Sequence, residues 1–137
     1  MKATARRAGT YRHEIAIRTH QVTADEPKDQ GGEDSAPSPQ ELLAASLASC
    51  TAITMEMYAT RKGWELPDVS VDVEYQPAER GCPTRFDLVV RIPADVSAED
   101  AQRLMTIAAK CPVHRTLEGE VMFSERCERV SAPARAA

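Results

Sequence analysis

The chain has 137 residues, enough for one hydrophobic core, and we expect a single domain over residues 1–137. Apolar residues make up 42% and charged residues 28%, as in ordinary globular proteins, and the net charge of −4 excludes the basic surface of a nucleic-acid-binding protein. No apolar run reaches the roughly 18 residues of a membrane span, and the N-terminus lacks the apolar stretch of a signal peptide, so we expect a cytoplasmic protein that binds no membrane.

The N-terminal part predicts one strand followed by a long loop. Residues 11–18 alternate in part, with Ile15 and Ile17 on one face, and the predicted strand can extend through residues 21–23. Residues 24–38 are rich in Asp, Glu, Gly, Pro and Ser, which indicates a loop. A loop of this length in a small domain favours a functional role, with disorder as the alternative. Its acidic residues lack the ligand spacing of a calcium loop and are interpreted as solvated.

The strongest predicted element is a long helix that begins at Ser38. Ser38 is a favourable N-cap, Pro39 suits the first helical position, and residues 41–62 contain neither Gly nor Pro before Gly63 ends the run. Apolar residues occur nearly all the way round this helix, with Cys50 in its middle. Such a helix lies in the centre of a fold or in a subunit interface.

The second half predicts two strands, two helical segments and a final strand. Residues 69–75 alternate as a half-buried strand, residues 85–92 form its antiparallel neighbour, and Cys82 lies exposed in the turn between them. A helix runs from Ser97 to Lys110, and Cys111-Pro112 starts a new helical turn, where the N-terminal dipole favours a thiolate. Residues 119–123 read as a strand. The core therefore covers about residues 11–123, and residues 124–137, with Cys127, form a loose tail.

The four cysteines show neither a CxxC pair nor zinc-finger spacing. Each can be a small buried apolar residue, but Cys50 together with Cys111 also provides the minimum for reducing a peroxide, a nucleophilic thiol and a resolving thiol. Cys111 and His114 with Cys50 and either His13 or His20 match no standard metal site, so we expect no metal and no cofactor. His114 is interpreted as a helix-surface or hydrogen-bonded residue.

Two motifs resemble the OsmC/Ohr family of osmotically inducible protein C-like and organic hydroperoxide resistance proteins. The first runs from Asp25 through Gly31-Gly32 and Ser38-Pro39 to Cys50, and the second is Cys111-Pro112, 61 residues after Cys50. The resemblance covers residues 11–123. It implies an α+β fold in which two chains intertwine into an obligate homodimer, with two long central helices wrapped by antiparallel sheets and active sites at the subunit interface.

The resemblance also implies an activity. Cys50 would be the peroxidatic thiolate and Cys111 the resolving thiol of an organic hydroperoxide reductase in oxidative-stress defence. The organic chain of the peroxide would lie against apolar helix residues, which favours organic hydroperoxides over hydrogen peroxide. An external dithiol or a lipoylated protein would reduce the resulting disulfide.

The sequence departs from the family pattern at two points. The family places a Glu ten residues before the first cysteine, where this chain has Gln40; its acid is Glu41, which nine residues of helix, about 900° of turn, put opposite Cys50. The family also uses an Arg from the N-terminal strands to stabilise the thiolate, for which Arg18 and then Arg12 are the candidates.

These departures keep other readings open. One is a non-peroxidatic redox sensor on the same fold, and another is a protein of that fold that binds an apolar ligand. A thiol–disulfide exchange protein is disfavoured by the missing CxxC motif.

Overall fold

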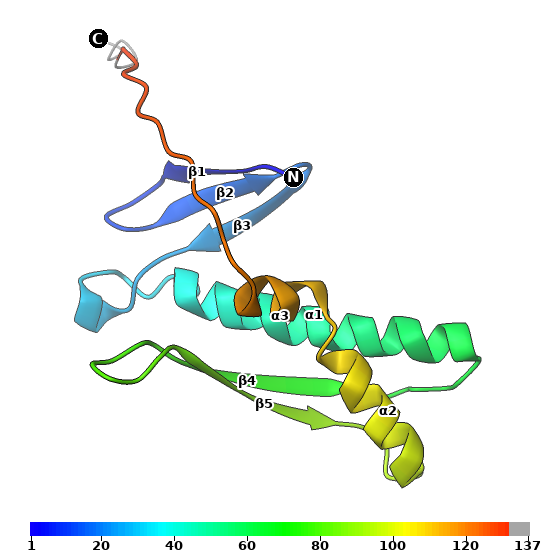
Figure 1. Cartoon of the computed structure of the whole chain (residues 1–137). Helices are drawn as coiled ribbons and strands as arrows, with labels where there is room; N and C mark the ends of the chain where they lie inside the picture. The colour runs from blue at the N-terminus through cyan, green and yellow to red at the C-terminus, as the bar shows by residue number, and fades with distance from the viewer. Residues whose placement is uncertain (132–137) are drawn as a thin grey trace.

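The structure, a computed structural model, describes residues 1–131 and combines two antiparallel sheets with helices (Figure 1). The elements are β1 (Ala3–Arg7), β2 (His13–Ile17), β3 (His20–Ala24), the short 3-10 turn η1 (Lys28–Gln30), α1 (Pro39–Lys62), β4 (Ser70–Gln76), β5 (Arg85–Arg91), α2 (Ala98–Ala108) and α3 (Pro112–Glu118). The sheets have the orders β1-β2-β3 and β4-β5, one on each side of α1 (Figure 1). The α+β prediction is confirmed.

The N-terminal sheet differs from its prediction in two ways. The continuous strand predicted over residues 11–23 is wrong, because the chain reverses at Arg18 and Thr19 to form the β2–β3 hairpin, with Ile17 opposite His20. Arg18 takes a positive φ of 55°, a turn conformation that a continuing strand excludes. In addition, β1 pairs with β2 along its whole length and precedes the predicted core range. Its sequence lacks the apolar alternation that signals a strand.

The loop between β3 and α1 is closed by hydrogen bonds around Asp25. Asp25 is 1% exposed, and its carboxylate accepts hydrogen bonds from the Ser35 hydroxyl at 2.6 Å and from the backbone N–H groups of Ser35 and Glu26. Gly32 packs so closely on Glu26 that an added Cβ would lie 1.9 Å from the Glu26 carbonyl oxygen. The loop is therefore held in one compact conformation, which argues against the disordered alternative.

The predicted boundaries of α1 are confirmed. The Ser38 hydroxyl accepts the Glu41 backbone N–H at 3.2 Å while the Glu41 carboxylate accepts the Ser38 N–H at 2.7 Å, and Gly63 ends the helix with a φ of 71°. One face is buried against β4, α2 and α3. The opposite face leaves Ile53 and Met57 52% and 57% exposed, so within one chain α1 is covered on one side only.

The apolar character of α1 is compatible with two kinds of helix. By length and composition alone this helix is able to cross a membrane, although the core helix of a globular domain has the same properties. The packing of α1 against β4, α2 and α3 agrees with a core helix of a globular domain.

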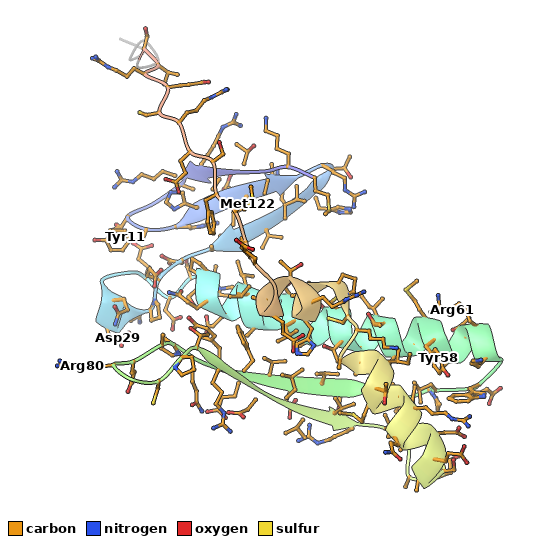
Figure 2. All side chains as sticks on the ribbon, viewed as in Figure 1. Tyr11, Asp29, Tyr58, Arg61, Arg80 and Met122 are labelled. Carbon is orange, nitrogen blue, oxygen red and sulfur yellow. The ribbon has the colours of Figure 1, made fainter. Side chains whose placement is uncertain are left out.

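The core lies between α1, the β4–β5 hairpin and α2. Met55, Leu104 and Ala108 form its buried centre, and the Tyr58 and Trp64 rings meet edge to face at a centroid distance of 5.6 Å. The hairpin has the predicted antiparallel pairing, and its turn leaves Cys82 exposed as expected. Figure 2 shows Arg80 at the tip of this hairpin and Tyr58 near the far end of α1.

The strand predicted over residues 119–123 is wrong for the single chain. After α3 the chain is irregular up to residue 131, and Val121, Met122 and Phe123 are 51%, 89% and 83% exposed. A strand needs a neighbour for its backbone hydrogen bonds, and within the described part of this chain β4 and β5 pair only with each other. Figure 2 shows Met122 on the segment that leads away from α3. Cys127 is exposed farther along it, and the rest of the predicted tail, residues 132–137, lies outside the described residues.

Candidate functional site

Cys111 occupies the start of α3, as its position before Pro112 predicted. It is the N-cap of the helix, and its Sγ accepts a hydrogen bond from the His114 backbone N–H at 3.3 Å. The Thr51 Oγ1 lies 3.8 Å from the same sulfur. Cys111 is fully buried, so these groups replace water around the sulfur.

The packing of α3 on α1 brings Cys50 and Cys111 together. Each of the two side chains is among the groups that shift the pKa of the other, and the Val113 backbone acts on both, so the thiols lie near each other. Cys50 keeps partial solvent exposure whereas Cys111 has none. Two thiols that the sequence separates by 61 residues thus form one site with an accessible and an enclosed member.

The two thiols differ in how readily they ionise. Burial raises the pKa of Cys50; the Val113 N–H lowers it, the neighbouring Cys111 raises it again, and the net pKa is above the ordinary value. Burial also raises the pKa of Cys111, but the hydrogen bonds from the His114 backbone, from Cys50 and from Thr51 outweigh it and the net pKa is lowered. The hydrogen-bond donors around Cys111 therefore favour its thiolate, whereas burial disfavours the thiolate of Cys50.

The two candidate arginines lie in the N-terminal sheet region. Arg18 is exposed at the β2–β3 turn, and Arg12 is half-buried just before β2. The Arg12 Nε is buried and has no hydrogen-bond partner within residues 1–131. Neither arginine is among the principal groups that set the pKa of Cys50 in this part of the chain. The Cys50 sulfur thus lacks a dominant cationic neighbour here.

Gln40 and Glu41 both lie in the first turn of α1. Gln40 is exposed, and Glu41 is engaged in the reciprocal hydrogen bonds with Ser38 that start the helix. The structure therefore gives Glu41 a local role at the helix N-terminus.

An apolar cavity of about 520 Å³ lies between α1, α3 and the β4–β5 hairpin. It is lined by Leu43, Leu47, Tyr75, Thr84, Phe86, Leu88, His114, Leu117 and Glu118. Two of these residues connect the cavity to the thiols, since the Leu47 carbonyl accepts the Thr51 hydroxyl and the His114 N–H donates to Cys111. Neither Cys50 nor Cys111 lines the cavity, so its apolar surface is joined to the thiol site through Leu47 and His114.

Sequence reasoning interpreted His114 as surface or hydrogen-bonded and gave no role to Thr51. His114 is hydrogen-bonded, with Nδ1 2.8 Å from the Ala109 carbonyl oxygen and Nε2 3.3 Å from a Glu118 carboxylate oxygen. Thr51 is 1% exposed, and the signal that could have found it is a hydroxyl that shares the helical spacing of the buried residues Leu47, Met55 and Ala59. Within residues 1–131, no three His, Cys, Asp or Glu side chains are grouped to hold a metal ion.

Known proteins resemble this chain in sequence. Residues 32–126 match the family described as OsmC-like protein. An uncharacterized protein of Acinetobacter baylyi is 30% identical over 115 residues, which cover 81% of this chain and 78% of that protein.

Two solved structures have a similar fold. An OsmC-like protein from Mycoplasma pneumoniae superposes with a TM-score of 0.74 at 22% identity, covering 86% of each chain. The organic hydroperoxide resistance protein OhrB of Bacillus subtilis superposes with a TM-score of 0.60 at 25% identity, covering 86% of this chain and 90% of that one.

Proposed function

This chain belongs to the OsmC-like protein family, and on that premise we propose that it reduces organic hydroperoxides with Cys50 and Cys111. Family membership and the similarity to an organic hydroperoxide resistance protein support a redox or peroxide-resistance role. The observation that carries the specific chemistry is that α3 packs on α1 with the two thiols near enough to shift each other's pKa, one partly exposed and one buried. A pair so arranged suits a peroxidatic thiol that meets substrate and a resolving thiol that does not.

The reaction proceeds in two steps. The Cys50 thiolate attacks the terminal oxygen of the hydroperoxide, the O–O bond breaks, and the alkoxide takes a proton to leave as an alcohol, with Cys50 oxidised to a sulfenic acid. The Cys111 thiolate then attacks the Cys50 sulfur, an S–S bond forms, and hydroxide leaves and is protonated to water. An external dithiol, either small or carried on a lipoylated protein, reduces the disulfide and restores both thiols.

The raised pKa of Cys50 means that the first step needs a cation near the sulfur. We assign this role to an arginine of the N-terminal sheet, Arg18 or Arg12, at the interface of a homodimer. Two features support the dimer: the exposed apolar face of α1 at Ile53 and Met57, and the unpaired segment at residues 119–123. A second copy would cover the first and offer a strand neighbour to the second. All four cysteines are free, which suits the reducing cytoplasm as the site of action.

The cavity supports organic hydroperoxides as the substrate class. It offers the side chains of Leu43, Leu47 and Leu117 and the aromatic ring of Phe86 to an alkyl or aryl group. Hydrogen peroxide gains nothing from such a surface, because it has no apolar part to remove from water. The expected preference for organic peroxides therefore comes from binding next to the thiols.

Peroxide consumption by cysteine variants tests this function. The reduced protein receives a small excess of cumene hydroperoxide or hydrogen peroxide, and peroxide loss and thiol state are followed by mass spectrometry. We expect wild type to consume the cumene compound faster and to form a Cys50–Cys111 disulfide, Cys50→Ser to be inactive, and Cys111→Ser to stop at a Cys50 sulfenic acid. Cys82→Ser is the matched control at an exposed thiol and should behave as wild type.

A second candidate function is a redox sensor or apolar-ligand-binding protein on the same fold. Gln40 in place of the family Glu and the raised pKa of Cys50 favour it, because both leave the thiol less activated. Thiols that remain reduced during the peroxide assay would support this candidate and refute the peroxidase. Binding of a fluorescent fatty acid in the cavity, weakened by Leu43→Asp, would then identify the ligand-binding function.

A further inference from the structure

Thr51 places a hydroxyl group inside the apolar contact between α1 and α3. It is 1% exposed and belongs to the buried face of α1. Its Oγ1 lies 2.8 Å from the Leu47 carbonyl oxygen and 3.8 Å from the Cys111 sulfur. The Thr51 hydroxyl is therefore near enough to donate a hydrogen bond either to the α1 backbone or to the buried Cys111 sulfur.

The hydroxyl has one proton and two neighbours that can accept it. When Cys111 is a thiol, Thr51 donates to the Leu47 carbonyl, and its oxygen can accept the Cys111 S–H. When Cys111 is a thiolate, the sulfur has no proton to give and needs donors, so rotation of the Thr51 hydroxyl supplies one. Leu47 keeps a partner in both cases, because its carbonyl also accepts a backbone N–H within the helix.

We propose that Thr51 is a positioning residue for the resolving step, in which its hydroxyl turns from the Leu47 carbonyl to the Cys111 sulfur when Cys111 loses its proton to become the attacking thiolate. With the His114 N–H on one side and Thr51 on another, the sulfur is held at the α1–α3 contact and directed at Cys50. The proposal rests on the proposed function, since it assigns Thr51 to the attack of Cys111 on oxidised Cys50.

The charge balance of that step explains why the donor must be adjustable. Before attack the Cys111 sulfur carries a full negative charge. As the S–S bond forms and the S–O bond of the Cys50 sulfenic acid breaks, the charge leaves with hydroxide, which is protonated to water. The hydroxyl can then return to Leu47. A fixed donor such as the His114 N–H stays in place throughout and cannot adapt in this way.

A purely structural role makes a different prediction. Buried threonines in helices commonly bond the carbonyl four residues earlier, as Thr51 does with Leu47, and this bond alone satisfies the hydroxyl. In that case, replacing the hydroxyl would alter stability but leave the ionisation of Cys111 unchanged. The titration of Cys111 therefore separates the two roles.

The test uses variants that differ only in the hydroxyl. In a chain with Cys50, Cys82 and Cys127 changed to Ser, Cys111 is the single thiol, and the ultraviolet absorbance of its thiolate is followed against pH. We expect Thr51→Val to raise the midpoint by about one pH unit and Thr51→Ser to leave it near the Thr51 value. Equal midpoints for Thr51 and Thr51→Val, or equal shifts in the Ser and Val variants, would overturn the proposal.

A second pair protects the test against a folding defect. If Thr51→Val does not fold, Thr51→Ala against Thr51→Ser makes the same comparison, since both lack the methyl group and only one lacks the hydroxyl. In the chain with all cysteines, one equivalent of cumene hydroperoxide should leave more dimedone-trapped Cys50 sulfenic acid in Thr51→Val than in Thr51→Ser. A chain that reduces no peroxide refutes the proposed function alone, whereas the titration still decides on Thr51.

Discussion

Cys50 and Cys111 face each other across the α1–α3 contact with opposite shifts in pKa. The buried Cys111 sulfur has hydrogen-bond donors from α3 and α1, which favour its thiolate. Partial burial and the neighbouring Cys111 both raise the pKa of Cys50 and so disfavour its thiolate. Within a single chain, the surroundings therefore favour the thiolate of Cys111, the proposed resolving thiol, over that of Cys50, the proposed peroxidatic thiol. A cation beside Cys50 would reverse this order, which makes the reactivity of Cys50 depend on what the N-terminal arginines contact.

Removing Cys111 should make Cys50 more reactive toward an alkylating agent. The Cys111 side chain raises the pKa of Cys50 through its hydrogen bond and its charge, so Cys111→Ser lowers that pKa and increases the thiolate fraction at neutral pH. Iodoacetamide labelling of Cys50, read by peptide mass spectrometry, should be several-fold faster in Cys111→Ser than in wild type. Cys82→Ser serves as the control with an unchanged rate, and a slower rate in Cys111→Ser would contradict the coupling.

Asp25→Asn should loosen the loop before α1 in a pH-dependent way. Hydrogen bonds from the Ser35 side chain and backbone hold the pKa of Asp25 below its ordinary value of 3.8. Their effect outweighs burial, which raises this pKa. The ionised carboxylate therefore stabilises the folded chain above that value, and this stabilisation is lost as the pH falls through the lower folded-state pKa.

Thermal unfolding at two pH values measures this effect. Asp25→Asn should unfold a few degrees below wild type at pH 7, with a much smaller difference below the folded-state pKa. Asp29→Asn changes an exposed carboxylate in η1 and should match wild type at both. An Asp25→Asn deficit that is the same at acidic and neutral pH would exclude the carboxylate as its cause.

Leu104→Ala should destabilise the fold by about 2–5 kcal/mol, because it opens a cavity in the cluster with Met55 and Ala108. Met105→Ala is the adjacent control: Met105 is 49% exposed, and its loss should cost less than about 1 kcal/mol. Urea unfolding followed by circular dichroism gives both values. Similar losses for the two variants would show that the core lies elsewhere.

Ile53→Asp should convert the proposed homodimer to a monomer. Ile53 lies on the apolar face of α1 that its own chain leaves exposed, and a carboxylate there would be buried unpaired in an interface. Analytical ultracentrifugation should give a dimer mass for wild type and for Gln102→Asp, an exposed change on α2, and a monomer mass for Ile53→Asp. A monomeric wild type would refute the dimer.

Local sequence signals predicted the elements with self-contained boundaries. Ser38, Pro39 and Gly63 delimit α1 through interactions made within its first and last turns, and Cys111-Pro112 begins α3 in the same way. The strands β4 and β5 follow from the alternation of apolar residues over a short hairpin. The two cysteines that meet were identified from their motifs, which lie on just these locally determined elements.

Elements that depend on a partner were predicted poorly. The strand β1 has little apolar alternation and exists because β2 pairs with it, whereas residues 119–123 include three consecutive apolar residues and have no strand beside them in the described chain. Backbone hydrogen bonding between strands depends on what lies alongside, which a single segment does not encode.

The sequence by itself therefore determined the family and the long helix, and it singled out Cys50 and Cys111 as the candidate thiols. Only the tertiary structure decided that Thr51 reaches Cys111, that Ser35 holds Asp25, and that donors from α1 and α3 lower the pKa of Cys111. The physical reason is that ionisation depends on the donors, charges and solvent within a few ångströms of a sulfur. Those neighbours come from segments up to 63 residues apart, as with Cys50 and Val113, and are set by how α3 packs on α1.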